Sequence, residues 1–79
     1  MKKEISNNKL CKIDSDRIGL LQNSKVHIIN IVNGKVEYIV SINETKFFYS
    51  IMVMRGMLLC GSDKGIICCF NLKTKKYIF

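Results

Sequence analysis

The stretch that decides the fold is RIGLLQNSKVHIINIVNGK, from Arg17 to Lys35, because the chain nearly repeats it as MLLCGSDKGIICCFNLKTKK, from Met57 to Lys76. The later halves of the two copies match at an offset of 41 positions, and the earlier halves match at an offset of 39. A turn two residues longer in the second copy would account for the difference. The pairs that define these offsets are Val26 with Ile67, Asn30 with Asn71, Ile18 with Met57, and Leu20 with Leu59.

Extra residues that are confined to a turn, while the flanking apolar pattern is kept, indicate a structural repeat. A period near ~40 residues that is built from short strands is typical of propeller blades or a related array. Repeats of this kind usually provide binding surfaces and not catalytic pockets. The sequence therefore predicts a binding role before any single site is considered.

Eight short runs rich in β-branched and aromatic residues are predicted to be strands, since polar turn residues separate them. The Asn33-Gly34 pair suits a tight turn with positive φ at both central positions. The two most apolar runs are predicted to be central strands that are covered on both faces. The eight runs are Lys9–Ile13, Arg17–Gln22, Lys25–Ile31, Val36–Ile42, Phe47–Val53, Met57–Gly61, Ile66–Leu72 and Lys76–Phe79.

The predicted fold is all-β, an antiparallel meander of two four-stranded propeller-like blades. Residues 1–8 are predicted to be a flexible N-terminus, residues 9–43 the first blade-like repeat and residues 44–79 the second. A chain of 79 residues holds one domain at most. Blades need about 3 or more repeats to cover their faces, and the sequence ends inside a predicted strand. We therefore expect a fragment of a larger propeller, whose open faces further blades or another chain would cover.

The second copy resembles the third-strand segment of WD40 repeats, a β-propeller family. Phe70-Asn71 stands where that family has Trp-Asp, so the resemblance is to a divergent member. It implies that Ile67 and Cys69 face inward, and it extends from about Lys9 to the end of the sequence. The residues that carry the repeat signature, all with a structural role, are Asn30, Gly34, Gly61, Ser62, Gly65, Phe70 and Asn71.

The cysteines and the single histidine do not have the spacing of a metal site. Cys68 and Cys69 are adjacent in a predicted strand and point to opposite faces, and Cys60 is expected to approach Cys69 diagonally. Cys11 is expected to occupy the position of Ile51. All four are interpreted as small apolar core residues. The sequence marks neither an acid, base and nucleophile set nor a cofactor motif, which predicts a non-catalytic protein without a cofactor.

The formal net charge of +7 leaves nucleic acid open as a partner. Most lysines fall at turns or strand ends, which is typical of an ordinary solvated surface. In the aromatic run Phe47–Tyr49, only Phe47 and Tyr49 could share one face of a strand and stack on bases. The main interpretation is a protein–protein interaction scaffold, and the alternative is a small basic β-barrel that binds nucleic acid.

The sequence shows neither a secretory signal nor an apolar run of the ~20 residues that a membrane helix needs. We therefore expect an intracellular, cytoplasmic protein with protein partners and no membrane attachment.

Asp14 and Asp16 flank Ser15 in a predicted turn. Their role is expected to be the capping of that turn, since the later ligands of a calcium loop are missing.

Overall fold

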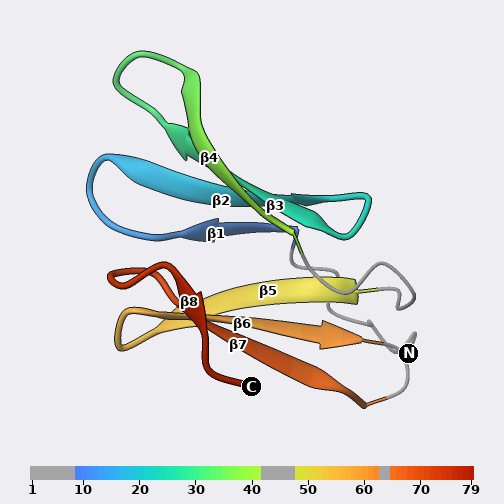
Figure 1. Cartoon of the computed structure of the whole chain (residues 1–79). Coiled ribbons are helices and arrows are strands. Elements are labelled where there is room, and N and C mark those ends of the chain that lie inside the picture. The colour runs from blue at the N-terminus through green and yellow to red at the C-terminus, as the bar shows by residue number, and fades with distance from the viewer. Residues whose placement is uncertain (1–8, 42–47, 63–64) are drawn as a thin grey trace, which may run out of the picture.

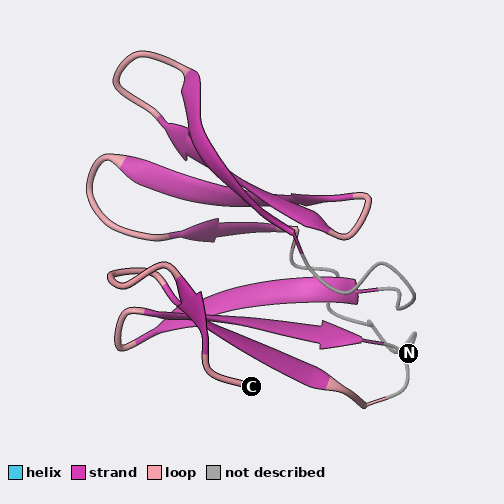
Figure 2. Cartoon of the chain, in the orientation of Figure 1, coloured by secondary structure: helices cyan, strands magenta, loops and turns pink. Residues whose placement is uncertain are grey.

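Stiff, β-branched side chains favour an extended backbone, and the residues that the structure describes form eight short β-strands (Figure 2). The structure is a computed structural model that describes residues 9–41, 48–62 and 65–79. Each predicted run overlaps one observed strand. The predicted N-terminal segment 1–8 and the predicted junction between residues 43 and 44 lie outside the described residues. The strands are β1 Leu10–Lys12, β2 Arg17–Gln22, β3 Lys25–Asn30, β4 Lys35–Ser41, β5 Phe48–Met54, β6 Met57–Ser62, β7 Ile67–Asn71 and β8 Lys76–Tyr77.

The strands form two antiparallel four-stranded sheets in which every strand pairs with its neighbour in sequence (Figure 1). The first sheet has the order β1-β2-β3-β4 and the second has the order β5-β6-β7-β8. The all-β class and the meander of two four-stranded units are confirmed. The predicted alternative of a closed barrel is wrong for the part of the chain that the structure describes, because its two sheets share no paired strands.

The two sheets stack on each other and bury one shared apolar core (Figure 1). We call the face that each sheet turns toward this core its inner face, and the opposite face its outer face. The backbones approach most closely where β1 and β2 lie beside β5. The buried core residues are Leu21, Val26, Ile28 and Val40 from the first sheet, and Phe48, Ile51, Leu58, Cys60 and Phe70 from the second.

Only the inner face of each sheet is well covered. Ile67 in β7 is 56% exposed and Ile39 in β4 is 48% exposed, and both lie on outer faces. The sequence correctly placed β3 and β7 at central positions, but the prediction that both of their faces are covered is wrong. Two stacked sheets have four faces in total, and their mutual contact covers only two of them.

A β-bulge interrupts the pairing of β3 with β4. The register shifts between Ile28, which pairs with Tyr38, and Ile29, which pairs with Val36, so Glu37 has no partner opposite it. The extra residue changes which face the following side chains occupy. Tyr38 and Val40 pack toward the core while Val36 lies on the outer face, so the period of two that would align all three is broken at Glu37.

The second sheet repeats this bulge. Tyr77 pairs with Phe70, and the backbone N–H groups of Ile78 and Phe79 both donate to the carbonyl of Cys69, at 2.8 and 3.4 Å. The Cys69 N–H in turn donates to the Phe79 carbonyl at 2.8 Å. The predicted strand Lys76–Phe79 is therefore regular only over Lys76–Tyr77, and Ile78 takes the place that Glu37 has in the first sheet.

Two hairpins use two-residue turns whose central residues both have positive φ, as in type I′ turns. One contains Asn23 (φ 53°) and Ser24 (φ 61°), and the other contains Arg55 (φ 53°) and Gly56 (φ 76°). The predicted type I′ turn at Asn33-Gly34 is wrong, because four residues join β3 to β4 and, of these, Gly34 alone has positive φ.

Arg55 is the residue whose backbone conformation should limit the stability of the second sheet. The left-handed region costs a side chain with a Cβ about 1–2 kcal/mol, and asparagine tolerates it better. We expect Arg55→Asn to raise the free energy of unfolding by about 0.5 kcal/mol, measured by urea denaturation. Gly56→Ala should lower it by about 1 kcal/mol, because an added Cβ meets no atom within 4 Å and only the backbone is strained.

The matched control for this prediction is Lys73→Asn, which removes the same charge from a turn position without positive φ. An equal stability gain in Lys73→Asn and Arg55→Asn would show that charge, and not backbone conformation, sets the effect.

Candidate interaction surfaces

The strand pairing corrects the alignment of the two repeats. Asn30 pairs with Arg17 and Asn71 pairs with Met57, so Arg17 is equivalent to Met57 at an offset of 40. By the same pairing Ile18 is equivalent to Leu58 and Leu20 to Cys60. The predicted pairs at an offset of 39 are therefore wrong by one residue. Between the equivalent pairs Leu21–Val26 and Gly61–Ile67, the first sheet has four residues and the second has five, so the register places one extra residue here and not two.

The first strands of the two sheets need a similar correction. Cys11 pairs with Gly19 and Met52 pairs with Leu59, which are equivalent positions of β2 and β6. Cys11 is therefore equivalent to Met52, and Leu10, not Cys11, is equivalent to Ile51. The offset is 41 for β1 and β5, 40 for β2 and β6, and 41 again for the later strands.

The corrected alignment shows that equivalent residues lie on opposite sides of the core. Val26 is buried on the inner face of the first sheet, whereas its equivalent Ile67 lies on the outer face of the second. Ile29 lies on the outer face of the first sheet, whereas its equivalent Phe70 is buried at the core. The inner face of the first sheet thus corresponds to the outer face of the second. Equivalent faces of the two sheets therefore point in the same direction along the stack.

The outer face of the second sheet is apolar and hollowed. A groove of about 410 Å³ runs over β5, β6 and β7. Its floor is at Gly61, and the equivalent residue of the first sheet, Leu21, is a buried core side chain. A glycine therefore leaves open a space that a leucine fills in the other sheet. The lining residues are Ser50, Ile51, Met52, Leu59, Cys60, Gly61, Ile67 and Phe79.

The outer face of the first sheet is also apolar but carries basic residues at its margins. Strand alternation places Ile18, Leu20 and Ile29 there together, and His27 lies between Leu20 and Ile39 on the same face. Lys12 and Lys25 share this face and are exposed. The groove over the second sheet is lined by uncharged side chains, although Lys76 of the edge strand β8 pairs with Asn71 on that same face.

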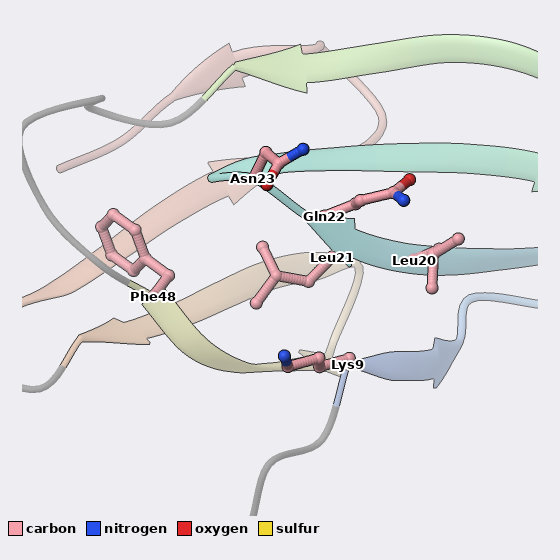
Figure 3. A pocket seen from close by; sticks show the side chains of 6 residues that line it. All are labelled: Lys9, Leu20, Leu21, Gln22, Asn23 and Phe48. Atoms are coloured by element: carbon pink, nitrogen blue, oxygen red, sulfur yellow. The ribbon is translucent and has the colours of Figure 1, made fainter.

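A smaller hollow of about 320 Å³ lies at one end of the seam between the sheets. Leu21 of β2 and Phe48 of β5 lie on its two sides, and both are buried core residues (Figure 3). The other lining residues are Lys9, Leu20, Gln22 and Asn23. This set offers one ammonium group and two amides, and its members include neither a carboxylate nor a histidine.

Asn30 and Asn71 hold equivalent turns through their side-chain amides. The Oδ1 atom of Asn30 accepts hydrogen bonds from the N–H groups of Val32 at 2.8 Å and Asn33 at 3.2 Å. The Oδ1 atom of Asn71 accepts from Lys73 at 2.8 Å and Thr74 at 2.9 Å. The side-chain amides thus replace backbone partners for two turn N–H groups in each sheet.

Apart from Gly34, which lies in the turn between β3 and β4, the other signature residues lie in the second sheet and its turns. Phe70 is buried and makes an edge-to-face contact with Tyr77, with ring centroids 5.1 Å apart. Gly65 has a positive φ of 77°. The Ser62 hydroxyl accepts a hydrogen bond from the Ile66 N–H at 3.1 Å. Ile67, which the WD40 resemblance placed inward, faces away from the core.

A polar cluster in the first sheet was missed by the sequence analysis. Arg17 Nε donates to Asp14 Oδ2 at 3.0 Å, and Arg17 also lies 3.5 Å from a Glu37 carboxylate oxygen. Asn30 Nδ2 donates to the other Glu37 oxygen at 2.9 Å. The Arg17 side chain, through its hydrogen bond, holds the pKa of the exposed Asp14 carboxyl below its usual range. Asp14 also accepts a hydrogen bond from the Asp16 N–H at 2.9 Å, so it caps its turn as expected.

Cys60 pairs directly with Cys68, so the expected diagonal approach to Cys69 is wrong. Cys69 points to the other face of the sheet. Burial raises the pKa of the Cys60 thiol to about 12, so the neutral thiol is favoured. Within the described ranges, groups of three or more cysteine, histidine or carboxylate side chains that could hold a metal ion are not found.

Helices long and apolar enough to cross a membrane are likewise absent from the described part of the chain. Comparison of the sequence with models of known protein families and with curated proteins, and of the fold with solved structures, finds no match.

The two signature asparagines should differ in their tolerance of aspartate. Asn71 is used as an acceptor in its two turn contacts, and a carboxylate can make both. We therefore expect Asn71→Asp to change the free energy of unfolding by less than about 0.5 kcal/mol. Asn30→Asp replaces a donor that faces Glu37 with a second negative charge, and it should cost about 1–2 kcal/mol at pH 7. Urea denaturation of both variants checks the difference, which should shrink below pH 4.

Asn30→Ala and Asn71→Ala complete this test, and each should cost about 1–2 kcal/mol. A small and equal effect of all four substitutions would show that the amides do not hold the turns.

The buried thiol of Cys60 predicts a loss of stability in alkali. Its folded-state pKa lies above the unfolded value, so its contribution is fully present below about pH 9 and is lost as the pH rises toward about 12. Burial also raises the pKa values of Cys11, Tyr38 and Tyr77, so the ionisation of these groups likewise lowers the stability in alkali. Urea denaturation at several pH values should show a shallower alkaline decline for Cys60→Ala than for the wild type. Parallel declines would contradict the assignment.

Proposed function

We propose that this chain is a non-catalytic, propeller-type repeat segment that serves as a protein–protein interaction scaffold. The observation that carries the proposal is the pair of apolar outer faces on opposite sides of the two-sheet stack. Ile67 and Phe79 on one outer face are 56% and 69% exposed, and Leu10 and Ile39 on the other are 59% and 48% exposed. Apolar patches of this kind on folded proteins mark surfaces that bind other proteins.

The organisation of the sheets supports the same role. Each sheet is formed by pairing among its own four strands, so its face can present side chains without further ordering of the backbone. The turns that Asn30 and Asn71 hold fix the ends of the central strands β3 and β7. The result is a pair of preformed surfaces, which reduces the conformational entropy lost on binding.

The alternative of nucleic-acid binding has less support. Phe48, the middle residue of the aromatic run, is 7% exposed and packs in the core, so it is not available for stacking on a base. Phe47 and the side chain of Tyr49 lie outside the described residues. Arg17 is engaged with Asp14 and Glu37, and the Lys75 ammonium lies 4.5 Å from the centre of the Tyr38 ring.

A photo-crosslinking amino acid at single positions tests the interaction role. We expect incorporation at Ile67 or Ile39, on the two outer faces, to give crosslinks to protein in extracts of the source cells. Incorporation at Val32 is the matched control, because that side chain is 77% exposed but lies in a turn. Mass spectrometry of the products then identifies the crosslinked peptides.

Crosslinks from Val32 as strong as those from the two faces would contradict the proposal, and so would an absence of protein crosslinks from both faces. Products that contain nucleic acid would support the alternative. They should then weaken as the salt concentration rises.

A further inference from the structure

We propose that the partner of each outer face is a second copy of this chain, stacked head to tail. The outer face of the first sheet of one copy lies on the outer face of the second sheet of the next copy. This inference deepens the proposed function and rests on it, because it names what covers the two faces. It requires no new kind of contact, since it repeats the packing that already joins the two sheets within the chain.

The first argument is the equivalence of the faces. Within the chain, the inner face of the first sheet packs on the inner face of the second. The outer face of the second sheet is equivalent in register to the inner face of the first sheet, because Ile67 is equivalent to Val26 and Cys69 to Ile28. The outer face of the first sheet is equivalent to the inner face of the second sheet, because Ile18 is equivalent to Leu58. The two open faces are therefore equivalent to the two faces that already pack together.

The second argument is shape. The first sheet has Gly19 and Leu21 on its inner face, and the second sheet has Leu59 and Gly61 at the equivalent outer positions. The groove over Gly61, about 410 Å³ in volume, has room for apolar side chains from a facing sheet. The outer face of the first sheet supplies such side chains from Leu20 and Ile29.

The third argument is charge. Lys12 and Lys25 lie on the outer face of the first sheet, so two such faces would place like charges against each other. The groove over the second sheet is lined by uncharged side chains. Like charges across an interface disfavour the wrong pairing. Charge thus disfavours contact between two first-sheet faces. The equivalence of the faces favours contact between unlike ones, which leaves one free face of each type at the two ends of the stack.

A contact between unlike faces has a testable signature. Heterologous interfaces continue into rings or open stacks, whereas a contact between identical faces stops at a dimer. A substitution on one face therefore blocks one end of each copy and leaves the other end competent. Two copies that are blocked at opposite ends should combine with each other but not with themselves.

The experiment uses Ile39→Lys on the first sheet and Ile67→Lys on the second, with Val32→Lys in a turn as the control. Each substituted residue is at least 48% exposed, so the fold should tolerate lysine there. Light scattering after size-exclusion chromatography measures the mass, and circular dichroism verifies the β-structure. We expect the wild type and Val32→Lys to form species of three or more copies at micromolar protein.

Each face variant alone is expected to be a monomer of 9.1 kDa. A 1:1 mixture of the two face variants should give a heterodimer of about 18 kDa, twice the 9.1 kDa of one chain. Dimers of a single variant would overturn the proposal, because they would show contacts between identical faces. A mixture that stays monomeric would also overturn it.

A wild-type chain that stays monomeric separates the two proposals. If its faces still crosslink to a different protein, the interaction role stands and the second copy is excluded as partner. If the faces give no protein crosslinks either, both proposals fail.

Discussion

Apolar contact between the two inner faces is the interaction on which the rest of the structure depends. Strand pairing holds each four-stranded sheet together, but in the described ranges it does not join one sheet to the other. Val26, Ile28 and Leu58 are fully buried only because the second layer is present. An isolated sheet of this size leaves both faces in water, and burial at about 25 cal/mol per Å² is what favours stacking. The same physics acts on the two faces that this contact leaves open.

The strands and most of the turns could be predicted from the sequence because their signals are local. Each strand is marked by an alternating or continuous run of stiff apolar residues, and polar residues separate one run from the next. These signals depend only on residues that are close together in the sequence. The assignment of residues to the inner and outer faces of the sheets failed because it depends on the exact alignment of the two repeats. An error of one residue reverses the face of a whole strand, so the alignment of Leu20 with Leu59 hid the equivalence of Leu20 with Cys60.

The surfaces and the polar cluster depend on arrangements that the sequence does not display. The bulge at Glu37 brings its carboxylate beside Asn30 and Arg17, and neither propensity nor period marks where a bulge will fall. The two asparagines were easier to interpret, because an amide at the same place before two turns already suggests its role. The exposure of Ile67 depends on which face of the second sheet packs against the first sheet. This is a property of the two sheets together and not of the strand that contains Ile67.

The order of the strands has a consequence for how the chain folds. The widest pairing, Lys25 with Ser41, joins residues only 16 positions apart, and every paired strand follows its partner directly. Short sequence separations lower the entropy lost before native contacts form, and such chains fold quickly. Each sheet can thus form one hairpin at a time, independently of the other sheet. The slow, cooperative event is then the docking of two nearly finished layers.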